Sequence, residues 1–98
     1  MDTSDAAEIR AEAVSLLERV TRLKATEAGW NVIETGIDAL VLAEEAGDLK
    51  EFEQATRELE ILAGNHRAKV GTVPAKPAPP PLRVRVDHLI HTLKGQKK

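Results

Sequence analysis

The chain has 98 residues, of which 42% are hydrophobic and 2% aromatic, so it fits one modest domain with a core of aliphatic side chains. It contains no cysteine, which excludes a disulfide scaffold, a thiolate zinc site and a cysteine nucleophile. The formal net charge of −2 hides an asymmetry. Residues 1–64 hold fifteen Asp and Glu against six Lys and Arg, whereas residues 65–98 hold eight Lys and Arg against one Asp. The basic end is therefore expected either to neutralise the acidic part within the molecule or to bind a partner.

The character of the chain favours a cytoplasmic protein that does not enter a membrane. Residues 1–5 are acidic and polar, unlike a signal peptide. No apolar run approaches the length that spans a bilayer. The absence of cysteine agrees with this location.

The first predicted helix covers about residues 6–24. Its apolar residues recur at steps of four and three, as they do on one face of an α-helix. Asp5 and Glu8 have the spacing of a capping box at its start. The stripe consists of Ile9, Ala13, Leu16, Val20 and Leu23, and we expect Leu16 and Val20 in the core.

The pattern between Thr26 and Gly64 predicts two helices joined by a tight turn at residues 46–48. Thr26 is placed to cap the first of them and Asp48 the second. Gly47 suits the left-handed position between them. Because the turn is short, the helices should be antiparallel neighbours with facing apolar stripes. The residues expected in this part of the core are Trp30, Ile33, Ile37, Leu40, Phe52, Leu59 and Leu62.

The composition changes after Gly64, and we divide the chain into three parts. Residues 1–64 are predicted to form a bundle of three antiparallel helices, residues 65–80 a proline-rich extended linker, and residues 81–98 a basic amphipathic helix with a tail. Proline fixes φ and lacks an N–H, so the linker should be a polyproline II strut or a wrap over the bundle. The predicted fold class is therefore all-α.

The last helix is the candidate partner-binding element. Its apolar stripe could pack on the bundle of its own chain or fill a groove of a partner, and its arginines would orient it against an acidic surface. The residues concerned are Leu82, Arg83, Arg85, Val86, Leu89 and Leu93. Self-association would also help to stabilise so small a core, but the sequence fixes no copy number.

No pattern predicts catalysis, a cofactor or a metal site. His88 and His91 are three residues apart, but zinc needs at least a third ligand, and the only other histidine, His66, is distant in the sequence. Phosphate loops and the common catalytic motifs are absent. Nucleic-acid binding by the basic tail is a weaker alternative, since the acidic part would repel phosphate and no aromatic side chain is available for base stacking.

Several stretches carry a resemblance to a known family over roughly residues 30–93. They are Trp30 at the start of the second helix, Gly47-Asp48-Leu49, Glu58-Leu59-Glu60 followed by Asn65-His66-Arg67, the proline run, and the closing residues 82–93. In these features the chain resembles the CATRA-associated small proteins, named for caspase and TPR-repeat associated conflict systems of prokaryotes.

The resemblance implies an accessory protein in a prokaryotic defence or programmed-death system, with a caspase-like peptidase and TPR-repeat proteins as candidate partners. It supplies no catalytic residue, and it matches Trp30, Arg67, Arg83 and Arg85 to the family pattern as structural or contact residues. The first hypothesis is a non-enzymatic adaptor or regulator. The second is a substrate or inhibitor of the peptidase, cut or gripped in segment 65–80. Its candidate cleavage sites are Arg67 and Lys69.

Overall fold

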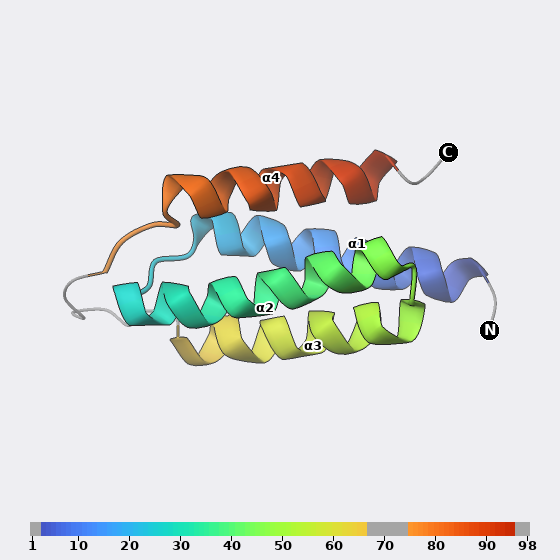
Figure 1. Cartoon of the computed structure of the whole chain (residues 1–98), viewed down its shortest axis with the longest axis horizontal. Helices are drawn as coiled ribbons and strands as arrows, with labels where there is room; N and C mark the ends of the chain where they lie inside the picture. Colours follow the sequence, from blue (N-terminus) through green and yellow to red (C-terminus); the bar gives the residue numbers. More distant parts are fainter. Residues whose placement is uncertain (1–2, 67–74, 96–98) are drawn as a thin grey trace.

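The computed structural model describes residues 3–66 and 75–95, which form four helices (Figure 1). The described part of the chain is all-helical and holds no strand, apart from one isolated β-bridge between Ala25 and Lys76. The helices are α1 (Thr3–Arg22), α2 (Glu27–Ala46), α3 (Leu49–His66) and α4 (Pro80–Gly95).

The four helices surround one core and alternate in direction along the chain (Figure 1). α2 packs on α3, α3 on α1, α1 on α4 and α4 on α2, which closes a ring. α1 and α2 are therefore diagonal partners, as are α3 and α4, and the neighbours α1 and α3 run in the same direction. α4 thus completes the enclosure of the core, which is one of the two packings that the sequence left open for the last helix.

Small residues set the distance between α2 and α3. A Cβ atom added at Gly36 would lie 3.0 Å from Cδ1 of Leu59 and 3.1 Å from Cδ1 of Leu62. One added at Gly29, a full two turns earlier, would lie 3.1 Å from the carbonyl oxygen of His66. The glycines therefore let the two helices approach more closely than any larger residue would allow.

The predicted turn chemistry between and before these helices is confirmed. Gly47 has φ of 72°, a left-handed conformation that glycine adopts without a Cβ clash. The Thr26 hydroxyl accepts a hydrogen bond from the N–H of Gly29 at 3.1 Å. The Asp48 carboxylate accepts one from the N–H of Glu51 at 3.2 Å. Both side chains thus satisfy N–H groups that the first turn of a helix leaves unpaired.

Three helix boundaries differ from the expected ones. α1 begins at Thr3, so Asp5 lies inside the helix and not at its cap. α3 continues through Gly64 to His66, because Gly64 has no positive φ and therefore does not end the helix. α4 begins at Pro80, one residue early, and proline is tolerated in a first helical turn since its missing N–H would be unpaired there anyway.

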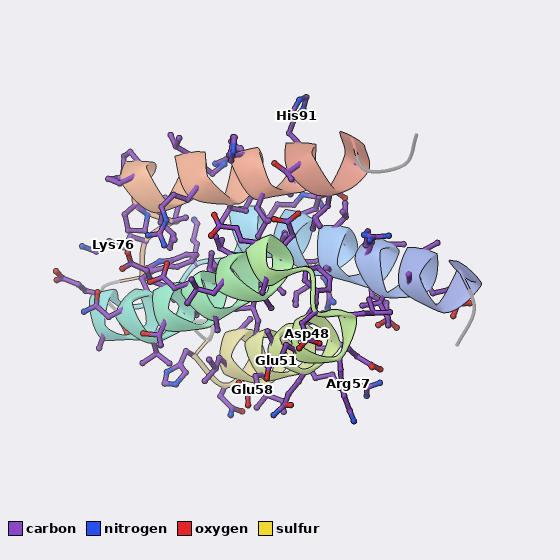
Figure 2. The ribbon with its side chains drawn as sticks, turned by 45° about the vertical axis from the view of Figure 1, so that its right-hand side comes forward. Asp48, Glu51, Arg57, Glu58, Lys76 and His91 are labelled. Atoms are coloured by element: carbon purple, nitrogen blue, oxygen red, sulfur yellow. The ribbon has the colours of Figure 1, made fainter. Side chains whose placement is uncertain are left out.

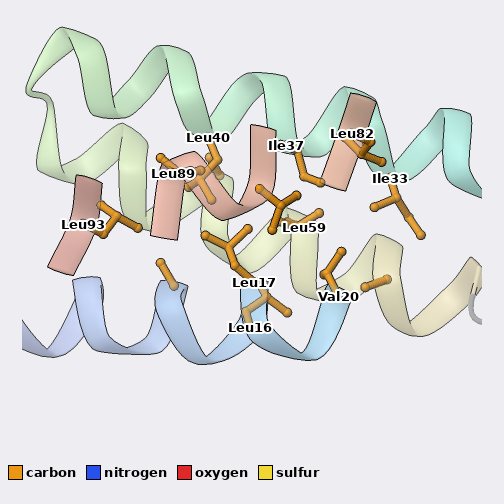
Figure 3. Close-up of a cluster of buried hydrophobic side chains, with 14 of the residues drawn as sticks. Leu16, Leu17, Val20, Ile33, Ile37, Leu40, Leu59, Leu82, Leu89 and Leu93 are labelled. Carbon is orange, nitrogen blue, oxygen red and sulfur yellow. The ribbon is translucent and has the colours of Figure 1, made fainter. Parts of the chain in front are cut away.

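All four helices contribute to the core, as the side chains in Figure 3 show. Every residue expected there is buried except Leu62, which is half-buried and whose Cδ1 lies close to Gly36 of α2. The buried residues among those expected are Leu16, Val20, Trp30, Ile33, Ile37, Leu40, Phe52 and Leu59.

Candidate interaction surface

The apolar stripe of α4 is occupied within the molecule. Leu82, Val86, Leu89 and Leu93 are all buried in the core, and Figure 3 shows Leu82, Leu89 and Leu93 pointing into it. These are four of the six residues expected to bind a partner. While α4 is docked, a partner cannot reach them, and in this position the stripe packs on the bundle of its own chain.

Ion pairs hold the two sides of α4 to the helices beside it. The guanidinium of Arg85 lies 2.8 Å from a carboxylate oxygen of Glu34 and also contacts Asp38, both on α2. On the other side, Nζ of Lys94 lies 3.4 Å from a carboxylate oxygen of Glu18 on α1. The basic end of the chain therefore neutralises part of the acidic bundle internally, which was one of the two expectations from the charge asymmetry.

The side of α4 that lies opposite its buried stripe is exposed. Val84 is 66% exposed, and the neighbouring His88 and His91 are exposed on the same side, where His91 points away from the other helices (Figure 2). Arg83 lies beside them with its Nε 3.6 Å from a carboxylate oxygen of Asp87. We call these five residues the α4 outer face. It combines one exposed apolar side chain with groups that can carry positive charge.

The residues described by the structure hold no group of three metal-ligating side chains placed to bind one ion. His88 and His91 therefore gain no third ligand from residues 3–66 or 75–95. Within the same ranges, no helix combines the length and apolar character needed to cross a bilayer.

The described end of the proline-rich linker is fixed to the bundle. The backbone groups of Ala25 and Lys76 exchange two hydrogen bonds of 3.0 Å. The indole N–H of Trp30 donates a third, of 2.8 Å, to the carbonyl oxygen of Lys76, and Ala78 packs against the core. Residues 75–79 thus wrap over the connection between α1 and α2. The sequence signal for this contact is only general, since a buried indole N–H needs some acceptor.

Both described flanks of the candidate cleavage segment 65–80 are part of the folded bundle. Asn65 and His66 belong to α3, and Lys76 is bound to the bundle. Arg67 and Lys69 lie outside the described residues, as does the rest of the segment 67–74.

A groove between α1 and α3 was not anticipated from the sequence. It contains two clefts, of about 450 Å³ and about 690 Å³. The first has an apolar floor that includes Leu16 and Leu23, and the second has Ile9 and Leu49. The charged residues of the first cleft, which we call the basic end, are Arg19, Arg22, Lys24 and Glu60. The charged residues of the second, the acidic end, are Glu8, Glu12, Asp48, Lys50, Glu53 and Arg57.

Carboxylates surround the one arginine of the acidic end. Arg57 donates a hydrogen bond of 2.7 Å to Glu53, and this bond and the charge of Glu53 raise the pKa of the Arg57 guanidinium. The charges of Glu12 and Glu60 raise this pKa further. The groove was missed because its charges come from helices about forty residues apart, and only their packing brings those residues into one place.

The fold and this surface define a small all-helical protein with a basic C-terminal helix docked on an acidic bundle. The family model of the CATRA-associated small proteins (CATASP) matches residues 12–97. Because the match covers most of the chain, the protein belongs to this family, which confirms the resemblance inferred from the sequence. The family name states an association with CATRA systems. No curated protein and no solved structure matches the chain.

Proposed function

We propose that the protein is a non-enzymatic adaptor that binds a protein partner in a CATRA system through the α4 outer face. The observation that carries this proposal is Val84, which is 66% exposed on a helix whose opposite side is buried. Docking fixes α4 before a partner arrives, so the partner does not have to order this helix on binding. The partner surface would cover Val84 and offer carboxylates to Arg83 and the histidines.

The charge distribution supports this face as the site of approach. Residues 1–64 carry the large acidic excess of the chain, and they would repel an acidic partner from most of the molecule. α4 is the described element in which basic residues outnumber acidic ones most clearly. An acidic partner surface would therefore be steered toward α4.

The candidate partners are the caspase-like peptidase and the TPR-repeat protein that the family association implies. TPR arrays offer extended concave surfaces, into which one face of a helix can be laid. A bound α4 would use its outer face in such a groove and keep its inner face in its own core.

A matched pair of variants tests this site. Val84→Asp and Leu42→Asp each place a charge at a residue that is 66% exposed, the first on the α4 outer face and the second on α2. Binding of each full-length variant to the peptidase and to the TPR-repeat protein is measured by calorimetry. Val84→Asp should weaken binding by about tenfold or more, which corresponds to the loss of one central contact. Leu42→Asp should leave it unchanged, and equal affinities for the two variants would refute the proposal.

The alternative is that the protein is a substrate or inhibitor of the peptidase, engaged in segment 65–80. Support comes from the anchoring of both described flanks, since His66 ends α3 and Lys76 is bound to Ala25 and Trp30. A cut between them would leave α4 held by its buried stripe. Incubation with the peptidase should then give two fragments by denaturing mass spectrometry that still migrate together in native conditions. An intact chain would argue against cleavage.

Nucleic-acid binding is the weaker candidate. Arg85 and Lys94 are engaged with carboxylates of the bundle, which leaves less positive charge for phosphate. A steep loss of affinity with rising salt would be the signature of such binding.

A further inference from the structure

The groove between α1 and α3 has ends of equal and opposite formal charge. The basic end counts three basic residues against Glu60. The acidic end counts four acidic residues against Lys50 and Arg57. The formal charge of the basic end is therefore +2 and that of the acidic end is −2. The two ends lie on one surface that follows the length of the parallel helices α1 and α3.

We propose that this groove is the interface of a homodimer, in which the second copy lies antiparallel across it. A twofold axis through the middle of the groove places each acidic end on the basic end of the other copy. Both contacts are then attractive, and the same patch is used by both subunits, as a closed dimer requires. A parallel arrangement would instead put like charges together, which disfavours it.

The exposed charges of the groove are largely free to make these contacts. Arg22 and Lys24 at the basic end, and Glu8 at the acidic end, are exposed and form no ion pair with another described residue. Arg19 is 4.0 Å from Glu60, and their side chains are 61% and 60% exposed, so this pair can rearrange at little cost. In the antiparallel dimer, Arg19 and Arg22 meet Glu8 and Glu12 of the second copy.

Apolar side chains in the floor of the groove supply the rest of the interface. Ile9 and Leu49 at the acidic end and Leu23 at the basic end are only half-buried. A second copy would remove the remaining apolar surface of these residues from water, which favours association. The two clefts offer space for the side chains that the second copy contributes.

The dimer goes beyond the proposed adaptor function and does not depend on it. In the ring of four helices, the α1 and α3 pair is opposite the α2 and α4 pair. Dimerisation through α1 and α3 therefore leaves the α4 outer face uncovered in both copies. Two such faces in one particle can bind a repetitive or dimeric partner with an avidity that exceeds the affinity of one face.

Charge-swapped variants of the full chain test the antiparallel pairing. Arg19→Glu with Arg22→Glu makes both ends of the groove acidic, and Glu8→Lys with Glu12→Lys makes both ends basic. The mass of each protein is followed by sedimentation equilibrium over a wide concentration range. The natural chain should dimerise, and each double variant alone should show a dimer dissociation constant raised by about tenfold or more because like charges now meet.

Mixing the two double variants should restore the dimer, because every end of one then meets an end of opposite charge on the other. Native mass spectrometry identifies the product as a heterodimer. Arg83→Glu on the α4 outer face is the control and should leave the dimer unchanged. A monomeric natural chain at all concentrations, or a mixture that stays monomeric, overturns the proposal.

Two further measurements check that the variants fold and that the dimer depends on salt. All four substituted residues are exposed, and Arg10, which faces the end cleft beside Phe52, is left intact. Far-ultraviolet circular dichroism should therefore show the natural helix content in each variant. If one variant loses this helix content, the proposal is tested on the natural chain by raising the salt concentration. Its dimer should dissociate as salt screens the two charge contacts, and a dimer insensitive to salt contradicts the proposed pairing.

Discussion

The indole N–H of Trp30 donates a hydrogen bond of 2.8 Å to the carbonyl oxygen of Lys76, a residue 46 positions later in the chain. Trp30 is 2% exposed, so this bond pairs a polar atom at the edge of the core with the backbone of the linker. The same carbonyl oxygen also accepts the N–H of Ala25. One backbone oxygen of the linker thus accepts hydrogen bonds from the connection after α1 and from the start of α2. The linker leads directly into α4.

Replacement of Trp30 by Phe tests the contribution of this bond. Phe keeps most of the ring volume and removes the donor, so the free energy of unfolding should fall by about 1–3 kcal/mol through the lost hydrogen bond and a small cavity. Trp30→Ala should cost more, roughly 3–5 kcal/mol. Urea denaturation followed by circular dichroism measures both. Equal losses for Phe and Ala would show that the hydrogen bond, and not the ring, dominates.

Sequence patterns predicted the local structure well because caps and turns depend on neighbouring residues. Thr26, Gly47 and Asp48 act as their types and positions indicated. The apolar periodicity also indicated which faces would be buried, and α4 is a case where the right stripe was identified but its burial against its own chain was left open. Periodicity identifies a face that must be covered, but it does not identify what covers it.

Contacts between distant segments were the part that the sequence could not supply. The bond from Trp30 to Lys76 has no local signal, since any carbonyl near the indole could have served. The close approach of Leu59 and Leu62 to Gly36 likewise joins residues that are distant in the sequence. The groove between α1 and α3 similarly depends on which helices are neighbours, and the ring order of the four helices is not encoded in any one of them.

The close packing at Gly36 predicts opposite outcomes at two helical glycines. Gly36→Val would place side-chain atoms where Cδ1 of Leu59 and of Leu62 already lie, and we expect a loss of about 1–3 kcal/mol from overpacking. Gly64→Ala meets no atom within 4 Å, and Gly64 lies in a helix without positive φ. It should therefore add stability, by up to about 1 kcal/mol, through better helix propensity. Thermal unfolding of both variants decides this, and a destabilised Gly64→Ala would contradict the packing.

The docked position of α4 predicts its protection from hydrogen exchange. The amides of the central turns of α4, around Val86 and Leu89, should exchange as slowly as those around Ile37 in α2, because the inner faces of both helices are buried in one core. Leu89→Ala should destabilise the protein by about 2–5 kcal/mol and accelerate exchange in α4 first. Fast exchange of α4 in the natural chain, with α2 protected, would show that α4 undocks independently.

The ion pairs of Arg85 predict a stability contribution that depends on salt. Arg85→Met keeps a long side chain and removes the charge that faces Glu34 and Asp38. These groups are 41–50% exposed, so solvent weakens the pairs, and we expect a loss of about 0.5–1 kcal/mol at low salt. The difference from the natural chain should shrink as salt is raised, since exposed charges are screened.

Arg83→Met provides the matched control for this experiment. Arg83 lies on the same helix but interacts with Asp87 on that helix only, at 3.6 Å, so its removal does not release α4 from α2. Its effect should be smaller, about 0.5 kcal/mol or less, as for other pairs one turn apart on a helix. Urea titrations at two salt concentrations measure both variants. If Arg83→Met cost as much as Arg85→Met, the contacts of Arg85 with α2 would have no special part in holding α4, and its buried leucines alone would account for the docking.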